Sequence, residues 1–184
     1  MEENRPGTAD ERRCFFAVWP DADVRARLAD WAEAARVSPP ARRVPPASLH
    51  ITLVFLGVLD GPQLDAVREV GANTAWAGAT LMLDRIAFWK RSRIVWAGSR
   101  DGCPALSALA EDLRGRLRRL GFAVEERPFL PHVTLYRKAH RKPRWEQRRV
   151  EWRMDGFCLA ESRLSPAGAQ YSVLDRWSAH GDVE

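Results

Sequence analysis

Short apolar segments that end at proline or glycine alternate with amphipathic stretches along this chain of 184 residues. Residues 14–19 have the length and apolar character of a strand, and Pro20 follows them. Asp21 can cap a helix that begins directly after it. The apolar positions of that helix recur at helical spacing: Val24, Leu28, Trp31 and Ala35. Residues 49–56 form the next predicted strand, and Gly57 ends it.

Two more helices are predicted further along the chain. One begins around Asp60, because Pro62 then stands in the first turn, where proline is favoured. The other begins around residues 101–104, and Gly121 is placed to end it. Its leucines form one stripe along the helix: Leu106, Leu109, Leu113, Leu117 and Leu120.

The remaining apolar patterns indicate strands. The ranges expected to form them are 80–89, 93–97, 122–126, 132–136, 155–164 and 171–177. Residues 38–46 contain four prolines and should be an extended connector. Because helices interleave with strands, while the basic turn at residue 90 suggests a hairpin, the expected class is α+β. We expect a flexible N-terminal tail over residues 1–13 and a single domain over residues 14–180.

Composition adds charge and compartment to this picture. The net charge is +5, and lysine occurs only at Lys90, Lys138 and Lys142, so the positive charge is nearly all arginine. Arginine suits phosphate, although a GC-rich genome would give the same bias. No apolar stretch approaches the roughly 20 residues that cross a bilayer, and the first residues lack the apolar core of a signal peptide.

The number and spacing of the cysteines also indicate the compartment. Cys14, Cys103 and Cys158 are odd in number and widely spaced, which predicts reduced thiols in place of a disulfide framework or a metal knuckle. The expected compartment is the cytoplasm, with no membrane partner.

A short repeat carries the candidate chemistry. Residues 49–53 read Leu-His-Ile-Thr-Leu, and residues 131–135 read Pro-His-Val-Thr-Leu. Side chains two apart in a strand point to the same face, so each segment presents a histidine and a threonine together. One such box has little weight, but two in matching strand contexts are an unusual coincidence. The polar pairs face either a cleft or a core that satisfies their hydrogen bonds.

Two facing histidine–threonine pairs suit acid–base chemistry on a phosphate. Imidazoles titrate near neutral pH, so one of His50 and His132 can accept a proton from water while the other donates one to a leaving oxygen. The hydroxyls of Thr52 and Thr134 can bind phosphate oxygens. Zinc is the weaker alternative, because a catalytic zinc needs three protein ligands and no carboxylate or cysteine is patterned with these histidines. We therefore expect neither a metal nor another cofactor.

Nearby arginines offer further phosphate contacts. Arg127 lies five residues before His132, where it could bind phosphate or instead pair with Glu125 or Glu126. Arg137, just after the second box, could face the same cleft. Residues 140–149 are a basic run with one tryptophan, which could bind an RNA strand or be an ordinary surface loop.

These residues resemble the 2H phosphoesterases, and specifically the bacterial and archaeal RNA 2',3'-cyclic phosphodiesterases, also called 2'-5' RNA ligases. The resemblance runs from about Cys14 to Trp177. It is carried by the two HxTx boxes and by supporting stretches at residues 44–50, 55–57, 93–98, 121–122, 127–132 and 162–171. It implies a bilobal α+β fold with pseudo-symmetric lobes and antiparallel sheets around a central cleft.

The same resemblance implies roles for the residues. His50 would be the proton donor to the leaving 3'-oxygen, His132 the base that activates water, and Thr52 and Thr134 phosphate ligands. The substrate would be RNA with a 2',3'-cyclic phosphate end, the product a 2'-phosphomonoester, and 2'-5' ligation the reverse reaction. A small cyclic nucleotide as substrate, or an RNA-end-binding module without turnover, remain alternatives. A monomer is expected.

Overall fold

The computed structural model describes residues 11–35, 37, 41–146, 148–165 and 168–179. Within these residues there are three α-helices and one 3-10 turn: α1 (Ala22–Ala34), α2 (Gly61–Ala72), α3 (Pro104–Arg119) and η1 (Pro46–Ser48). The strands are β1 (Arg12–Val18), β2 (Arg42–Arg43), β3 (Ile51–Leu59), β4 (Ala79–Leu83), β5 (Arg85–Trp89), β6 (Ile94–Gly98), β7 (His132–Arg137), β8 (Val150–Met154), β9 (Gly156–Ser165) and β10 (Gly168–Ser178). The α+β class is therefore confirmed.

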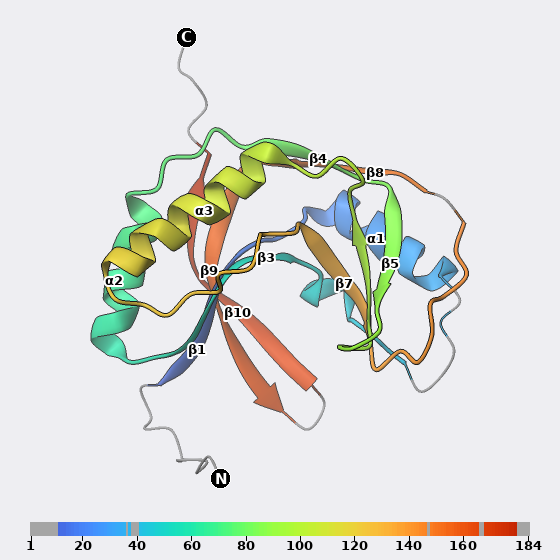
Figure 1. Cartoon of the computed structure of the whole chain (residues 1–184), viewed down its shortest axis with the longest axis horizontal. Helices are drawn as coiled ribbons and strands as arrows, with labels where there is room; N and C mark the ends of the chain where they lie inside the picture. Colours follow the sequence, from blue (N-terminus) through green and yellow to red (C-terminus); the bar gives the residue numbers. More distant parts are fainter. Residues whose placement is uncertain (1–10, 36, 38–40, 147, 166–167, 180–184) are drawn as a thin grey trace.

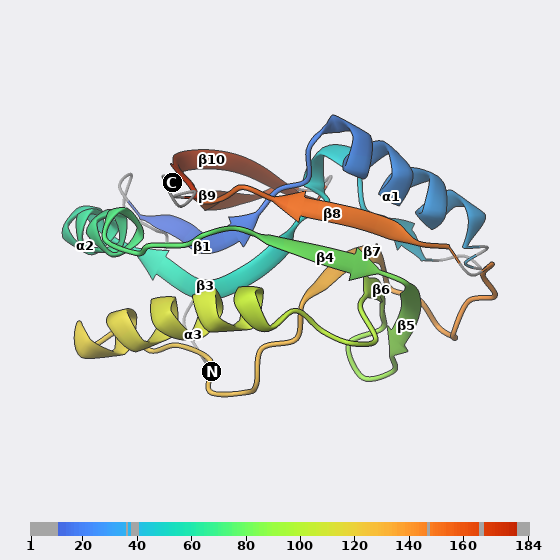
Figure 2. The ribbon, with the colours of Figure 1, turned by 90° about the horizontal axis from the view of Figure 1, so that it is seen from above.

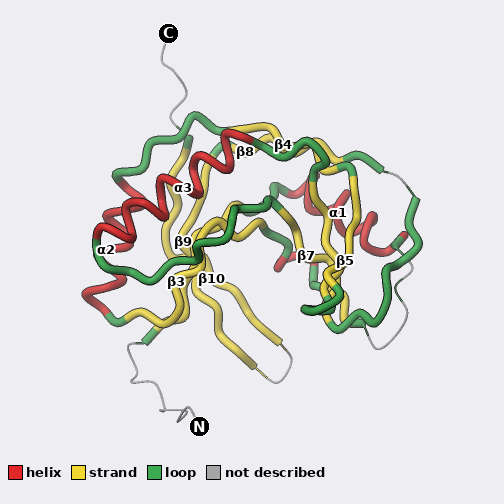
Figure 3. Tube along the Cα trace, viewed as in Figure 1, coloured by secondary structure: helices red, strands yellow, loops and turns green. Residues whose placement is uncertain are grey.

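The strands form two four-stranded sheets and one two-stranded ribbon, and every pairing is antiparallel. The first lobe contains the sheet β10-β9-β1-β3, against which α2 and α3 pack. The second lobe contains the sheet β2-β7-β6-β5, and α1 contacts β7. Figures 1 and 3 show these two lobes at opposite ends of the molecule. The expected bilobal arrangement with antiparallel sheets is confirmed.

The ribbon β4–β8 connects the two lobes. After Asp84, β4 continues into β5 of the second sheet, and after Asp155, β8 continues into β9 of the first sheet. Figure 2 shows the ribbon running between the lobes. One buried apolar cluster extends through both lobes, so the ribbon and this shared core fix the lobes relative to each other.

The helices begin where the sequence predicts. Asp21 and Asp60 cap α1 and α2 through their side chains, and Asp60 forms a capping box with Gln63. Gly121 has a φ of 83°, a left-handed conformation that glycine adopts readily at the end of a helix. The leucine stripe of α3 is buried only as far as Leu117. Leu120 is the C-cap residue of the helix and is 55% exposed.

Five details of the sequence prediction were wrong. The strand expected to end at Gly57 continues to Leu59, because Gly57 takes a left-handed φ of 78° beside a register shift and still pairs with Cys14 of β1. The strand expected at 80–89 is two strands in different sheets, divided at Asp84, whose amide donates to the Gly98 carbonyl. Residues 122–126 form no strand: the Phe122 amide donates to the Leu117 carbonyl at the end of α3. The prediction also lacked β8. The first strand begins at Arg12, inside the expected tail, of which residues 1–10 lie outside the described residues.

The expected state of the cysteines is confirmed, since all three are free and buried. Burial raises the pKa of Cys14 to about 11 and that of Cys158 to about 12. Among the described residues, no helix combines the length and the apolar character needed to cross a membrane.

Candidate active site between the two lobes

The two histidine–threonine boxes occupy equivalent places in the two lobes. His50 directly precedes β3 of the first sheet and Thr52 is its second residue, while His132 and Thr134 lie at the start of β7 in the second sheet. In both boxes the histidine and threonine are partly exposed, while the residues between and after them are buried. The predicted alternation is therefore confirmed. Strands β3 and β7 contact each other, so the boxes meet between the lobes.

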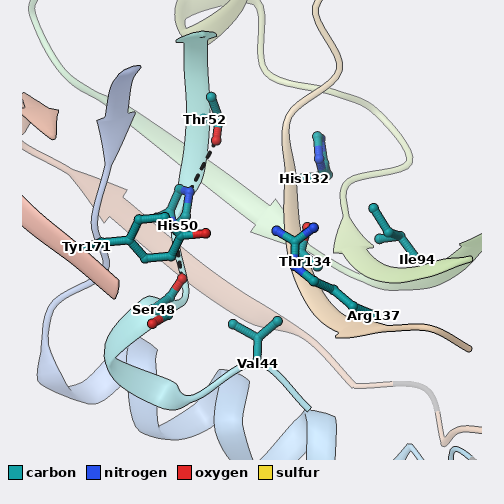
Figure 4. A pocket seen from close by; sticks show the side chains of 9 residues that line it. All are labelled: Val44, Ser48, His50, Thr52, Ile94, His132, Thr134, Arg137 and Tyr171. Atoms are coloured by element: carbon teal, nitrogen blue, oxygen red, sulfur yellow. Dashed lines mark hydrogen bonds between the residues drawn. The ribbon is translucent and has the colours of Figure 1, made fainter. Parts of the chain in front are cut away.

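All four side chains line one cavity of about 180 Å³. Figure 4 shows His50 and Thr52 on one side of it and His132 and Thr134 on the other. The full lining is Val44, Ser48, His50, Thr52, Ile94, His132, Thr134, Arg137 and Tyr171. None of these lining residues carries a carboxylate or a thiol. The chemistry available at this cavity is consequently that of two imidazoles, hydroxyls and one guanidinium.

The imidazole of His50 is held on both of its nitrogens. Its Nδ1 lies 2.8 Å from the Ser48 carbonyl oxygen and its Nε2 lies 3.2 Å from the Thr52 hydroxyl. A carbonyl oxygen only accepts hydrogen bonds, so Nδ1 carries a proton in either charge state of the ring. The neutral ring then has its lone pair on Nε2, beside Thr52, and Nε2 is the atom that gains or loses a proton.

Aromatic side chains fix the orientation of the His50 ring. Trp19 stacks on it at 4.6 Å between ring centroids and an interplanar angle of 20°. Tyr171 meets it edge-on at 5.0 Å, and Phe15 lies at 5.1 Å. The indole N–H of Trp19 donates to the Ala47 carbonyl at 3.1 Å, which ties the stacking partner to the segment that leads into His50. The ring therefore has little freedom to turn away from the cavity.

His132 has a corresponding environment in the second lobe. Its Nδ1 lies 2.8 Å from the Leu130 carbonyl oxygen, again two residues earlier in the chain. The Trp89 ring meets it edge-on at 4.6 Å, and Trp96 lies at 6.0 Å. Gly98, which pairs with His132 across β6 and β7, leaves room for Trp96, because a Cβ at that glycine would lie 2.4 Å from the indole. Because Nδ1 of His132 faces a carbonyl oxygen and therefore keeps its proton, Nε2 is the titrating nitrogen of His132 as well.

Both imidazoles favour the neutral form in the free protein. Burial lowers the pKa of His50 from 6.5 to about 4; the hydrogen bond to Ser48 opposes this shift, and the charges of Arg137 and His132 add to it. Burial also lowers the pKa of His132, against the hydrogen bond to Leu130, and Arg137 lowers it further. The positive charge of Arg137 thus lowers the pKa of both rings, and an anion bound between them would raise both pKa values again.

The cavity opens into a wider groove of about 400 Å³ on the first lobe. The groove shares His50, Thr52, Arg137 and Tyr171 with the cavity and adds mostly aromatic and small side chains: Arg13, Phe15, Phe55, Ser162 and Ala169. The guanidinium of Arg13 lies 4.5 Å above the Phe55 ring, which is 42% exposed. An apolar floor beside a polar cavity is typical of small-molecule sites.

Of the five predicted site residues, the structure brings four to the cavity and leaves Arg127 outside its lining. Arg127 is exposed, and its guanidinium pairs with Glu125 at 2.5 Å, the alternative partner that the sequence offered. Arg137 takes the place beside the histidines. Tyr171 and Ser48 lie in stretches that carry the family resemblance, but neither was predicted as a site residue, because only the tertiary fold carries them to the cavity.

Comparisons with known proteins agree with this architecture. Residues 20–180 match the model of the 2'-5' RNA ligase superfamily. The chain is 33% identical over 173 residues to the RNA 2',3'-cyclic phosphodiesterase of Escherichia coli (strain K12), with 92% of this chain and 98% of that protein covered. It is 30% identical over 190 residues to the RNA 2',3'-cyclic phosphodiesterase of Thermus thermophilus, covering 92% and 91%.

A solved structure supports the same relationship. The crystal structure of E. coli LigT complexed with 3'-AMP superposes with a TM-score of 0.86 at 31% identity, covering 92% of this chain and 99% of that one. The family match covers most of the chain, and the similarity in sequence and in fold extends through both lobes. The chain therefore belongs to the 2'-5' RNA ligase superfamily, as the two histidine–threonine boxes predicted.

Proposed function

We propose that this protein hydrolyses 2',3'-cyclic phosphodiester ends of RNA to 2'-phosphomonoesters by acid–base catalysis with two histidines and no metal. One observation carries the proposal: His50 and His132, from different lobes, line a single cavity together with Thr52, Thr134 and Arg137. The names of the relatives support the choice of substrate, because the E. coli and T. thermophilus proteins are both RNA 2',3'-cyclic phosphodiesterases.

In the proposed reaction, the phosphorus of the cyclic ester lies between the two imidazoles. Nε2 of His132 takes a proton from the attacking water as the new P–O bond forms. The P–O3' bond then breaks, and protonated Nε2 of His50 gives its proton to the leaving 3'-oxygen. The phosphate stays on the 2'-oxygen. The assignment of donor to His50 and acceptor to His132 follows the family resemblance.

The low pKa of His50 sets a condition on this mechanism. With a pKa of about 4, His50 is neutral in the free protein at pH 7, whereas a proton donor must be charged. A phosphodiester anion in the cavity offsets the positive charge of Arg137 and raises the pKa of both rings. Substrate binding and proton uptake by His50 are thus coupled in the proposal, and the proton arrives at Nε2 because Nδ1 is already protonated.

The other polar groups stabilise charge on the phosphoryl oxygens. The hydroxyls of Thr52 and Thr134 are oriented toward the same cavity as the rings, and Arg137 supplies a fork of donors suited to phosphate. A cyclic five-membered ester is already strained, so positioning and charge stabilisation are the main tasks. The neighbouring groove, with Tyr171 and Phe55, has room for the terminal nucleoside.

The finer properties of the partner follow from this proposal. The substrate is RNA with a cyclic phosphate end, bound by a monomer, and a 5'-hydroxyl in place of water would give the reverse reaction, 2'-5' ligation. The three free, buried cysteines are in keeping with the cytoplasm as the compartment.

Product analysis tests the proposal directly. An oligonucleotide ending in a 2',3'-cyclic phosphate is incubated with the protein, and the position of the product phosphate is determined by NMR against authentic 2'- and 3'-phosphate standards. A 2'-phosphate is expected, and His50→Asn and His132→Asn should each lower turnover by about 10² or more. Asparagine retains a donor near the position of Nδ1 but lacks Nε2. A 3'-phosphate product, or full activity in either variant, would contradict the mechanism.

A further inference from the structure

Charge is distributed unevenly along this chain. Residues 85–100 and 127–145 contain eleven of the 29 lysines and arginines and none of the 24 aspartates and glutamates. The rest of the chain has more acidic than basic residues, so the net charge of +5 comes from these two segments. Both belong to the second lobe, where they include β5, β6, β7 and the chain after β7.

The fold joins the two segments at one edge of the second sheet. The turn between β5 and β6 and the chain after β7 lie side by side in Figure 1, and the Ala139 amide donates to the Arg93 carbonyl at 2.9 Å. The Arg93 guanidinium also contacts the His140 ring. Arg93 and Lys138 both have a positive φ, 58° and 59°, which ordinary residues adopt rarely. The backbone of this edge is therefore held in a defined shape.

The cations at this edge are exposed and largely without acidic partners. Within the part of the chain that the structure describes, Lys90, Arg91 and Lys138 form no ion pair. Two arginines of α3 differ, since Arg114 pairs with Glu111 and Arg116 with Asp112. Like charges gathered without counter-charges repel one another, and a polyanion that binds there relieves the repulsion.

This basic edge is continuous with the candidate active site. Ile94 and Arg137 line the cavity, and the adjoining residues in the chain are Arg93 and Lys138. A chain of phosphates that leaves the cavity on this side passes from Arg137 directly to exposed cations.

We propose that a basic surface, formed by Lys90, Arg91, Arg93, Lys138 and Lys142, binds the backbone phosphates of the RNA strand on the 5' side of the reacting end. The inference rests on the proposed function and extends it, because it makes the preferred substrate an oligonucleotide instead of a nucleoside cyclic phosphate. The contacts are to phosphates, so they carry no base preference. Each contact releases counterions, and binding of the oligonucleotide weakens as salt increases.

The test compares two substrates and two charge variants. The substrates are a ten-nucleotide RNA ending in a 2',3'-cyclic phosphate and a nucleoside 2',3'-cyclic monophosphate. Arg91→Gln/Lys138→Gln removes one cation from each segment of the basic surface. Arg118→Gln/Arg119→Gln removes the same charge from exposed positions at the end of α3, on the first lobe, and is the matched control.

The first variant should raise KM for the ten-nucleotide RNA about five- to tenfold at low salt without lowering kcat. It should also reduce the slope of log KM against log salt concentration by about 1.4, since each phosphate contact on a single strand contributes about 0.7. Its kcat/KM for the nucleoside cyclic phosphate, and both parameters of the control variant, should stay within twofold of the parent.

Equal KM values for the RNA in the parent and Arg91→Gln/Lys138→Gln would overturn the inference. An equal loss of kcat/KM on both substrates would also overturn it. The same holds for a loss of activity that is seen only in ligation to a second strand. If the parent protein hydrolyses neither substrate, the proposed function fails, and fluorescence anisotropy with a labelled ten-nucleotide RNA bearing a 3'-phosphate then tests the surface separately. Tight binding by the control and weaker binding by the first variant would support the surface even in that case.

Discussion

The indole ring of Trp19 lies nearly parallel to the imidazole of His50, 4.6 Å away, and its own N–H is fixed to the Ala47 carbonyl. Trp19 therefore contributes to both properties that matter in His50, the burial that lowers its pKa and the orientation of Nε2 toward the cavity. It acts through His50 and is a positioning residue.

Replacing Trp19 should expose the His50 ring. In Trp19→Leu, we expect the pKa of His50 to rise from about 4 toward 6.5, because burial is the main cause of its depression. kcat/KM should fall about ten- to a hundredfold as the ring loses its fixed orientation. NMR titration of the imidazole measures the first effect. Trp19→Phe, which retains a stacking ring, should behave much more like the parent, and an unchanged pKa in Trp19→Leu would exclude this role.

A substrate with a better leaving group separates the roles of the two histidines. A cyclic ester with sulfur in place of the bridging 3'-oxygen releases a thiolate, which needs no proton donor. His50→Asn should recover most of its lost rate on this substrate, whereas His132→Asn should remain about 10² below the parent, because water must still be activated. Recovery in His132→Asn instead would exchange the two assignments.

Arg137 should contribute to the pH dependence of the reaction. In the proposed mechanism the active form has one protonated and one neutral imidazole, and both pKa values are lowered in the free protein. kcat/KM should consequently follow a bell with its acidic limb near pH 4 and its basic limb below pH 6.5. Arg137→Gln removes a positive charge beside both rings, so both pKa values rise and both limbs move to higher pH. Arg137→Lys keeps the charge and should leave the limbs in place, although KM rises when the fork of donors is lost.

The stability of the protein should depend on His50 over the same pH range. The unfolded chain binds a proton at His50 with a pKa near 6.5, while the folded protein resists protonation until about pH 4. The free energy of unfolding therefore falls as pH decreases through this window, by about 2 kcal/mol between pH 7 and pH 5 from this group. Urea unfolding at both pH values measures the loss. His50→Asn, which does not titrate, should lose that much less stability, and an identical loss in both proteins would rule out the effect.

Arg127 gives a contrasting expectation. Because it pairs with Glu125 and lies outside the lining of the cavity, Arg127→Gln should leave kcat and KM within about twofold of the parent. Arg137→Gln should lower kcat/KM by at least tenfold, as removal of a charged hydrogen-bond donor from a phosphate typically does. Steady-state kinetics on the same oligonucleotide provides both values. A large defect in Arg127→Gln would mean that a closed form brings this arginine to the substrate.

The histidine–threonine boxes were predictable because they depend on local geometry. Alternation along a strand puts His50 beside Thr52 and His132 beside Thr134 whatever the rest of the fold does, and both pairs appear as expected. The capped helices after Asp21 and Asp60 are equally local. These features required no knowledge of which segments meet in space.

The features that the sequence did not reveal depend on contacts between distant segments. Asp84 divides a continuous apolar stretch because its two halves pair with different partners, β8 and β6. Tyr171 reaches His50 only through the order of strands in the first sheet. The missed strand β8 is an exception, since its buried and exposed positions alternate regularly and the pattern was present in the sequence.

The two-stranded ribbon has a consequence for how this enzyme could be tuned. The two histidine–threonine boxes belong to separate sheets, and β4 and β8 lead, each through a single aspartate, into β5 of the second sheet and β9 of the first. A change in the twist or length of the ribbon would alter the separation of the imidazoles while leaving each box intact. Relatives with identical boxes could accordingly differ in the size of phosphoester they accept, with the selecting residues lying far from any atom that the substrate touches.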